Sequence, residues 1–397
     1  MVEWQTVKLG NIASINQSTY SSKEDWKFVN YLDTGNITMN QVDEIQYINT
    51  SMDKLPSRAK RKVRFNSIIY STVRPNQLHY GIIKNQPENF LVSSGFAVID
   101  VDFDKAIPEY IYYILSQQEI TEYLQSIAEQ SVSAYPSIKP SDIENLEFLL
   151  PDRKTQEKIV SILRSIDEKI VQNNEINNNL EYQAEALFHS LFVENVNPIW
   201  KDGVLSDLGT IVAGGTPSKT KPEYYSEKGI AWITPKDLSL NKSKFISHGE
   251  IDISELGFSK SSATKMPTGT VLFSSRAPIG YIAIAANEVT TNQGFKSVVP
   301  NENVGTAFMY YLLKFLLPTI EGMASGSTFK EISGAGMKSV PVIIPDNETI
   351  DKFNAFCTPI FQQQEVLEAE NSRLVDIIDA LLPKLMSGEL DVSDIEL

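Results

Sequence analysis

Several residue types are scarce in this 397-residue chain, and their scarcity excludes familiar kinds of site. The chain has one cysteine, Cys357, which excludes an internal disulfide and a cysteine-based metal cluster. The three histidines, His79, His189 and His248, are scattered and lack the spacing of metal ligands. A reducing, cytoplasmic compartment is therefore the simplest expectation.

Long hydrophobic runs are also missing. The longest, Phe308 to Pro318, is interrupted by Lys314 and is far shorter than the ~20 residues that a membrane span needs. The opening residues, MVEWQTVKLG, lack a basic stretch followed by an apolar one, so we expect no signal peptide. Apolar residues make up 42% and charged residues 21%, a composition typical of globular domains rather than of disorder.

The net charge of −15 argues against a surface that binds nucleic acid everywhere. The negative charge is unevenly distributed, however. Residues 346–397 carry 3 basic and 12 acidic groups, whereas residues 200–345 carry 14 basic and 12 acidic groups. Local basic clusters on a nearly neutral background can still neutralise phosphates.

An internal repeat organises the chain. Leu150–Leu163 aligns with Ile344–Cys357, and Ile68–Ser71 aligns with Val271–Ser274 further upstream. The chain therefore contains two copies of a repeat unit of about 195 residues, and each copy has a globular part followed by a helical part. We predict a first domain at residues 1–151, a long helix and linker at 152–199, a second domain at 200–345, and a second long helix with an acidic tail at 346–397.

Both helical segments show the alternating three- and four-residue spacing of a coiled coil. Asp152 and Asp346 are good N-cap residues, and ~38 helical residues would extend about 55 Å. Asn177 and Asn371 occupy equivalent positions in the apolar seam, where a polar residue commonly fixes register. Pro359 should kink the second helix or delay its start. An ordinary long helix with imperfect patterning is the alternative.

The two domains have a mixed pattern. Helical stretches are expected at Pro108–Ala128 and Gly305–Glu321. The β-rich runs are Val63–Val73, Phe90–Val101, Thr270–Phe273, Tyr281–Ala285 and Phe295–Val299. Each domain is therefore predicted to be α/β, and the helices to pair antiparallel as a pseudo-two-fold repeat.

The sequence contains patterns that resemble catalytic or nucleotide-binding motifs, but each lacks a residue or a geometry that the chemistry requires. Gly209–Thr216 resembles a phosphate-binding loop but has Gly215 where lysine is required. The Asn/Asp-Pro-Pro-aromatic tetrapeptide of amino-methyltransferase catalytic loops is absent from the sequence. Asp152 and Asp167 imitate a metal-nuclease pair, but ~22 Å of helix would separate two acids that must both lie within ~2–2.6 Å of one ion. We predict no catalytic residue and no metal ligand.

Residues suited to binding phosphates and bases are found on equivalent loops of the two domains. A basic run, Lys54–Arg64, can neutralise phosphates, and the loops Ser71–Gly81 and Ser274–Tyr281 each place an arginine near a proline. Arginine reads guanine, and asparagine or glutamine reads adenine. The loop Thr290–Lys296 could line the same surface. Two hydroxyl-rich segments, Ser131–Ile138 and Ser325–Ile332, could add hydroxyl and aromatic contacts.

The predicted DNA contacts of the first domain are Lys60, Arg61, Lys62, Arg64, Arg74, Asn76, Gln77, His79, Tyr80 and Tyr135. Those of the second domain are Thr216, Lys219, Arg276, Tyr281, Asn292, Gln293 and Lys330. The alternatives are a solvated basic face, ordinary turn residues, and packing of the hydroxyl-rich segments.

The order of these features resembles the DNA-specificity subunit of type I restriction–modification systems. The resemblance rests on the helix starts LPDRKTQEKIVSIL and IPDNETIDKFNAFC, the ending LLPKLMSGEL, and the motifs SSRAPIGY, TTNQGFK and SGSTFKEI. It covers the whole chain. The first domain departs by having Ser-Ser-Gly-Phe where the second has Asn-Gln-Gly-Phe, and the second helix has Thr349-Ile350 where the family usually carries Glu-Gln.

The resemblance implies a subunit without catalytic activity that reads an asymmetric, bipartite site on double-stranded DNA with two target-recognition domains. It implies two methyltransferase partners, which methylate adenine with S-adenosylmethionine, and restriction subunits that use ATP and Mg. This chain itself would hold no cofactor and contact no membrane. A coiled-coil scaffold without DNA readout, or a stand-alone nuclease or methyltransferase, are the alternatives.

Overall fold

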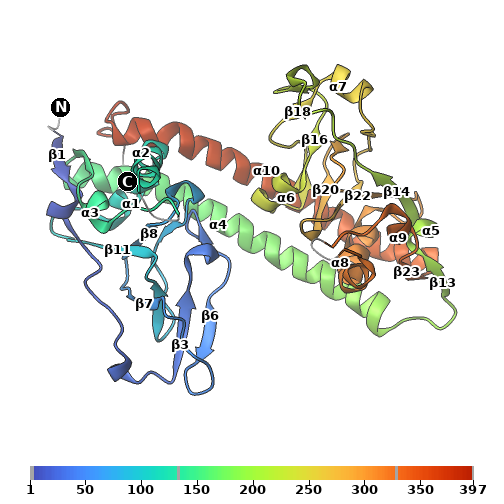
Figure 1. The fold of residues 1–397 in the computed structure, drawn as a ribbon, viewed down its shortest axis with the longest axis horizontal. Helices are drawn as coiled ribbons and strands as arrows, with labels where there is room; N and C mark the ends of the chain where they lie inside the picture. Colours follow the sequence, from blue (N-terminus) through green and yellow to red (C-terminus); the bar gives the residue numbers. More distant parts are fainter. Residues whose placement is uncertain (1–3, 132–134, 327–329, 396–397) are drawn as a thin grey trace. The chain divides into compact units, whose positions relative to one another are not determined.

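A computed structural model describes residues 4–131, 135–326 and 330–395 of the chain. The chain forms two compact units, Met1–Lys169 with Leu374–Leu397, and Ile170–Arg373 (Figure 1). The long helices α4 (Arg153–His189) and α10 (Asn347–Met386) each contribute residues to both units. Each unit therefore combines one globular domain with parts of two helices.

The first unit contains two four-stranded sheets, ordered β6-β3-β10-β7 and β2-β11-β8-β9. Its strands are β1 (Gln5–Lys8), β2 (Ala13–Ile15), β3 (Phe28–Leu32), β4 (Ile37–Thr38), β5 (Gln41–Val42), β6 (Gln46–Asn49), β7 (Ala59–Lys62), β8 (Ile68–Ser71), β9 (Tyr80–Ile82), β10 (Phe90–Ser93), β11 (Phe96–Val101) and β12 (Glu147–Leu150). Its shorter helices are α1 (Pro108–Ser116), α2 (Gln118–Glu129) and α3 (Pro140–Glu144).

The second unit is built around a five-stranded sheet, ordered β14-β22-β19-β20-β17. Its strands are β13 (Lys201–Val204), β14 (Gly209–Ala213), β15 (Tyr225–Ser226), β16 (Trp232–Ile233), β17 (Phe245–Ile246), β18 (Asp252–Ile253), β19 (Val271–Ser275), β20 (Ile279–Ala285), β21 (Thr290–Thr291), β22 (Lys296–Pro300) and β23 (Pro341–Ile344). Its shorter helices are α5 (Leu205–Leu208), α6 (Pro235–Leu240), α7 (Glu255–Ser259), α8 (Thr306–Met323) and α9 (Gly334–Lys338).

The mixed α/β prediction is confirmed, with differences at element boundaries. The expected run Phe90–Val101 is split, because β10 and β11 belong to different sheets. The expected run Val63–Val73 is longer than the strand observed there, because β8 begins only at Ile68 and Phe65 lies in an exposed turn before it. Part of the basic run, residues 59–62, itself forms the strand β7.

The internal repeat is visible in strand pairing. Phe96 pairs with Ser71 in the first domain, and Phe295 pairs with Ser274 in the second. β10 runs parallel to β3, just as β21 runs parallel to β16. Shared pairing of this kind, between strands far apart in sequence, indicates one ancestral topology used twice.

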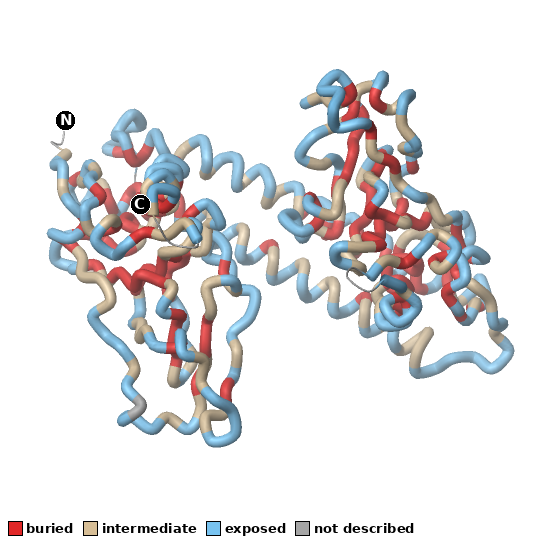
Figure 2. Tube along the Cα trace, in the orientation of Figure 1, coloured by how far each residue is buried: buried red, intermediate tan, exposed pale blue. Residues whose placement is uncertain are grey.

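Each unit buries its own core against helices (Figure 2). In the first unit, Tyr70 and Tyr110 pack with Leu163 of α4 and Leu385 of α10. In the second unit, Phe188 of α4 and Phe353 of α10 pack against α8 and the sheet. Burying one such side chain contributes roughly 1.5–3 kcal/mol, so the long helices are integral to each core.

The helix predictions are confirmed in their main features. Asp152 accepts a hydrogen bond from the backbone N of Thr155 at 2.8 Å, and Asp346 accepts one from the N of Thr349 at 2.9 Å. Both are N-caps, as expected. The expected delay at Pro359 does not occur, because α10 begins at Asn347.

In the second unit the two helices pair antiparallel, since Asn173 lies against Asn371 whereas Asn177 lies against Gln364. Asn371 accepts from Asn173 and donates to Asn174, both at 2.8 Å, while Asn177 offers only its backbone carbonyl to Gln364. The polar layer around Asn371 is therefore centred on Asn173, one helical turn before Asn177.

The two helix starts attach to their domains through different amides. Gln156 accepts from the backbone N of Ile107 at 2.9 Å and donates to the carbonyl of Pro151. The aligned position in the repeat is Ile350, and Asn354, one turn later, instead bridges Val304 and Phe308. The departure noted at Thr349-Ile350 is thus compensated within the same helix.

Candidate nucleic-acid interface

Three separate segments of the second domain meet where β19 ends. The backbone N and the Oγ of Ser275 both donate to the carbonyl of Gly294, at 2.7 and 3.0 Å. The backbone N of Ile332 donates to the carbonyl of Ser275 at 3.1 Å. These bonds hold the Arg276 loop beside the polar loop Asn292–Gly294, as the sequence predicted that the two loops share a surface.

A cavity of about 680 Å³ opens at this point. Among the predicted contacts, those lining it are Thr216, Lys219, Arg276, Asn292 and Gln293. The remaining second-domain candidates, Tyr281 and Lys330, are not among its lining residues. Tyr281 is half-buried beside the sheet core, and Lys330 is exposed next to Glu331.

Arg276 is partly engaged within the domain. Its Nη1 lies 3.5 Å from Oε2 of Glu331, and its side chain is 37% exposed. Lys296 approaches the other oxygen of Glu331 at 3.6 Å. One carboxylate therefore faces two cations, so the cluster keeps a net positive charge that suits a phosphate or an acceptor-rich base edge.

The sequence interpretation missed the acidic side of this cavity. Asp237 accepts from the backbone N and Oγ1 of Thr234, at 2.7 and 2.6 Å, and from the backbone N of Glu250 at 2.8 Å. It thereby places Lys236 against Glu250, with Nζ and Oε2 2.6 Å apart. This pairing raises the pKa of Lys236. The capping-box spacing from Thr234 to Asp237 was the available signal.

The first domain repeats the framework with a shift in its side chains. The backbone N and Oγ1 of Thr72 donate to the carbonyl of Gly95, at 2.8 and 2.9 Å, so Thr72 corresponds to Ser275. Val73 then corresponds to Arg276, and Arg74 corresponds to Ala277. Arg74 and Ala277 share a left-handed backbone, with φ of 48° and 51°. The loops are equivalent as predicted, but the two arginines lie one position apart.

Arg74 is exposed and stacks on an aromatic ring. Its guanidinium carbon lies 5.1 Å from the ring centre of Tyr135, a cation–π distance. Asn76 and Gln77 are exposed on the following turn, which the side chain of Gln125 in α2 holds by accepting from the backbone N of Asn76. Arg74, Tyr135, Asn76 and Gln77 therefore belong to one exposed neighbourhood.

Two candidates of this loop are tied to the domain interior. Tyr80 is only 4% exposed and stacks on Tyr70 with ring centres 5.7 Å apart, so it belongs to the core rather than to a binding surface. The Nδ1 of half-buried His79 lies 2.6 Å from the carbonyl oxygen of Ile37.

The basic run is divided between different surroundings. Lys60 is exposed, whereas Lys62 forms an ion pair with Glu24. The buried Nε of Arg61 has no hydrogen-bond partner among the described residues. The run is therefore not one uniform strip, because Lys60 and Lys62 share one face of β7 whereas Arg61 lies on the other.

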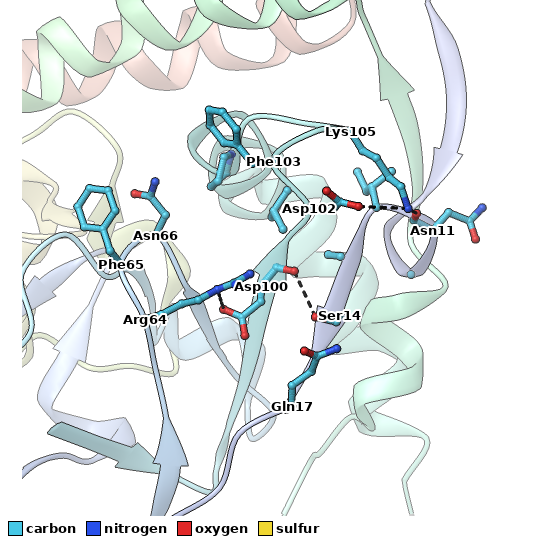
Figure 3. Close-up of a pocket in the computed structure, with 15 residues that line it drawn as sticks. Asn11, Ser14, Gln17, Arg64, Phe65, Asn66, Asp100, Asp102, Phe103 and Lys105 are labelled. Atoms are coloured by element: carbon cyan, nitrogen blue, oxygen red, sulfur yellow. Dashed lines mark hydrogen bonds and ion pairs between the residues drawn. The ribbon is translucent and has the colours of Figure 1, made fainter. Parts of the chain in front are cut away.

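Arg64 lies apart from the loop that carries Arg74. It precedes β8, whereas Arg74 follows that strand, so the two mark opposite ends of it. Its Nε lies 3.1 Å from Oδ1 of Asp100, within a second cavity of about 570 Å³ (Figure 3). We assign Arg64 to this cavity and not to the group around Arg74.

Parts of the hydroxyl-rich segments, residues 132–134 and 327–329, lie outside the described residues. Within the described ranges, no group of three or more histidine, cysteine or acidic residues could hold a metal ion. No helix within those ranges is both long and apolar enough to cross a membrane.

Comparisons with known proteins agree with one another. A family model described as type I restriction modification DNA specificity domain matches residues 1–182 and 199–369. The specificity subunit of type I restriction enzyme HindI from Haemophilus influenzae is 27% identical, over 98% of this chain and 100% of that protein. The MjaIX specificity subunit from Methanocaldococcus jannaschii is 37% identical, over 44% of this chain and 40% of that protein.

A solved structure supports the fold. The crystal structure of a type I restriction–modification S subunit from M. genitalium aligns with a TM-score of 0.57. The alignment covers 99% of this chain and 97% of that chain at 17% identity. At that identity the likeness bears on architecture and not on individual contacts.

Proposed function

The chain belongs to the type I restriction–modification DNA specificity family, and from this premise we propose how it reads DNA. Each domain reads one half of a bipartite site through the loop that follows β8 or β19. The observation that carries this proposal is the repeated framework in which Thr72 and Ser275 each hold a polar loop beside the arginine-bearing one. The chain supplies specificity, and chemistry resides in partner subunits.

In the second domain, Arg276, Asn292 and Gln293 contact base edges, and Lys219 contacts phosphate. This assignment rests on their meeting at one cavity, where Lys219 is exposed and Arg276 is anchored. Anchored side chains suit base readout, since a bidentate contact needs a fixed direction, whereas a flexible lysine suits a phosphate.

In the first domain, Arg74, Asn76 and Gln77 take the reading role, with Tyr135 supporting Arg74. The two half-sites differ, because Val73 stands where the second domain has Arg276, and Ser93-Ser94 stands where it has Asn292-Gln293. The recognised site is therefore asymmetric.

The partners are double-stranded DNA, two methyltransferase subunits that use S-adenosylmethionine, and restriction subunits that use ATP and Mg. Exposed apolar side chains on the long helices support protein docking there. In the second unit these include Val171, Ile176, Tyr182, Phe356 and Val366. Exposed apolar groups of this kind mark protein-interaction surfaces when they gather.

The test is site-specific methylation by the chain assembled with its methyltransferase, on duplexes that vary one base pair at a time. Arg276→Ala should relax preference at one base pair, at a cost of about 1–3 kcal/mol in binding. Lys219→Ala is the matched control and should weaken every sequence alike, lowering the salt slope by about one. A uniform loss from Arg276→Ala would contradict base reading, and assembly without any sequence preference would favour a scaffold.

A further inference from the structure

A buried aspartate holds an acidic loop at the cavity of the second domain. Asp237, which is only 8% exposed, accepts two hydrogen bonds from Thr234 and one from the backbone N of Glu250 at 2.8 Å. Gly249 allows this close approach, because a Cβ there would lie 2.5 Å from the carbonyl oxygen of Trp232 and 2.8 Å from the Oδ2 of Asp237. Burying a carboxylate is costly unless its oxygens are bonded, so the three bonds indicate a junction with one defined geometry.

The turn that carries Asp237 also lies directly against the polar loop of the cavity. The backbone N of Asn292 donates to the carbonyl of Ile233 at 3.0 Å, where this turn begins. The ring of Pro235 packs on Gly294, since a Cβ added to Gly294 would lie 3.0 Å from its Cγ. The turn, the acidic loop and the polar loop therefore form one continuous wall.

This wall adds an acceptor and an apolar side chain to the cavity. Glu250 and Ile251 both line it, and Ile251 is 49% exposed. Lys236 lines it too and pairs with Glu250, with the two side chains 64% and 62% exposed. An exposed pair of this kind contributes little to stability, so DNA can displace either member at small cost. The carboxylate of Glu250 is thus an accessible acceptor in a cavity whose arginine and lysines only donate.

The aligned turn of the first domain differs. The parallel pairing of β16 with β21, and of β3 with β10, aligns Ile233 with Leu32. Lys236 then corresponds to Gly35, which has no side chain to pair with an acid. The charged pair therefore belongs to the second domain and should act on the half-site of that domain.

We infer that Glu250 is a specificity-determining residue that accepts a hydrogen bond from the exocyclic amino group of a cytosine or adenine in the second half-site. The inference rests on the proposed function and deepens it, because it presumes that this cavity faces DNA. A carboxylate accepts from an amino group in the major groove, and it repels the O4 of thymine and the O6 of guanine, which present lone pairs. Asp237 is the positioning residue, and Lys236 balances the charge of the carboxylate in the free protein.

The sign of the charge effect separates base reading from a structural role. A carboxylate beside phosphates weakens binding to every duplex, so Glu250 lowers affinity while it selects a base. Glutamine at this position removes the charge, and its amide both donates and accepts, so it tolerates an amino or an oxo group. Glu250→Gln should therefore bind DNA more tightly overall and discriminate less at one base pair.

The experiment uses the full chain assembled with its methyltransferase. Binding is measured on duplexes that carry each of the four base pairs at every position of the second half-site. At one position the unaltered complex should prefer cytosine over thymine, or adenine over guanine, and Glu250→Gln should lower that ratio about tenfold, which corresponds to about 1.4 kcal/mol. The base preferred at that position identifies which amino group is read. Glu302→Gln, at an exposed glutamate that is not among the cavity's lining residues, is the matched control and should leave every ratio unchanged.

Asp237→Asn tests the positioning role. It should relax the same base pair as Glu250→Gln, and the double variant should lose nothing further, because both changes remove one contact. Additive losses in the double variant would contradict the positioning role.

Unchanged base ratios in Glu250→Gln, or a loss spread evenly over all positions, would overturn the inference. If the unaltered complex binds every duplex alike, the proposed function itself fails, which is a distinct result.

Discussion

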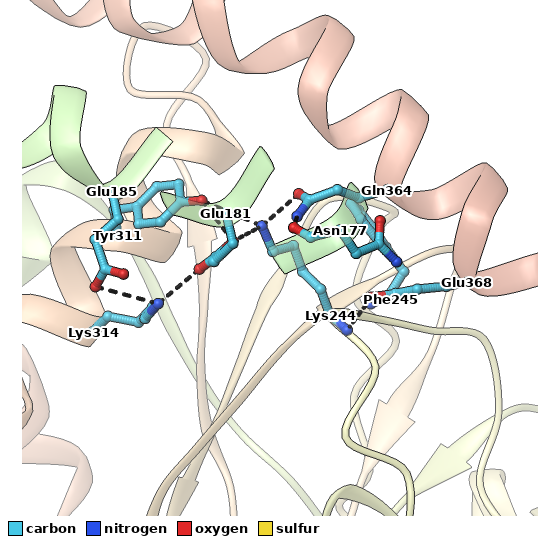
Figure 4. A network of polar contacts seen from close by, with 9 residues as sticks. All are labelled: Asn177, Glu181, Glu185, Lys244, Phe245, Tyr311, Lys314, Gln364 and Glu368. Atoms are coloured by element: carbon cyan, nitrogen blue, oxygen red, sulfur yellow. Dashed lines mark hydrogen bonds and ion pairs between the residues drawn. The ribbon is translucent and has the colours of Figure 1, made fainter. Parts of the chain in front are cut away.

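Replacing Glu181 by glutamine tests how strongly a buried polar cluster holds the second unit together. This Lys244 cluster consists of Lys244, Glu181 of α4, Tyr311 and Lys314 of α8, and Gln364 of α10 (Figure 4). Glu181 pairs with Lys244 and accepts from Lys314 at 2.7 Å and from the hydroxyl of Tyr311 at 2.8 Å. Burial pushes the pKa of Glu181 upward, but the ammonium groups of Lys244 and Lys314 outweigh it and hold that pKa at about 2. The glutamine variant keeps the shape and removes the carboxylate charge that Lys244 and Lys314 share.

The charge on Glu181 stabilises the folded unit by about 3 kcal/mol. A fall of the pKa from 4.5 to about 2 corresponds to roughly 3 kcal/mol, since each unit is about 1.4 kcal/mol. Removing one partner of a buried ion pair typically costs about 3–5 kcal/mol. Glu181→Gln should therefore lower the local unfolding free energy by about 3 kcal/mol at neutral pH.

Hydrogen exchange of the full chain, read in peptides from α8, measures this quantity locally. Glu185→Gln is the matched control, because Glu185 lies one turn away and approaches Lys314 at 3.5 Å with a side chain that is 38% exposed. Its cost should stay below about 1 kcal/mol, as for surface pairs.

The pH dependence has a definite sign. Because the folded-state pKa of Glu181 is depressed, its stabilisation is present above pH 4.5 and is lost as the pH falls toward about 2. The gap between the unaltered chain and Glu181→Gln should therefore shrink over that range. Equal costs for the two variants, or a gap that ignores pH, would refute this account of the cluster.

Three further predictions address the helices and the first domain. Leu180→Asp together with Leu374→Asp puts charge into half-buried positions of α4 and α10, so gel filtration should show loss of methyltransferase assembly. Tyr80→Phe should leave DNA preference unchanged. Tyr80→Ala should lower the free energy of unfolding, measured in urea, by about 3–5 kcal/mol. An altered DNA preference in Tyr80→Phe would show that Tyr80 contacts DNA. Arg64→Ala should leave the salt slope of DNA binding unchanged, because Arg64 pairs with Asp100 at the far end of β8; a lower slope would show that it does contact phosphate.

The sequence predicted features that depend on local pattern. Periodicity and cap residues are local signals, because they involve only neighbours close in sequence. They were sufficient to predict the N-caps Asp152 and Asp346, the apolar seam of both helices and the core strands. The repeat also predicted that the loops around Arg74 and Arg276 are equivalent, because their strands align.

Side-chain interactions between residues far apart in the chain could not be predicted from the sequence. Lys62 and Arg64 are engaged by Glu24 and Asp100, which are 38 and 36 residues away along the chain. The one-position shift between Arg74 and Arg276 depends on which strand residue pairs across the sheet. No local sequence pattern indicated that Lys244 is buried and paired, because its partners come from three separate helices.

The most direct test of the central claim compares Arg74→Ala with Arg276→Ala in the same assembled methyltransferase. Methylation is measured on one panel of duplexes that carries every single-base change in both half-sites. We expect Arg74→Ala to relax base preference in one half-site only, and Arg276→Ala to relax it in the other half-site only. If either change relaxes both half-sites, or if both changes act on the same one, the two domains do not read separate halves.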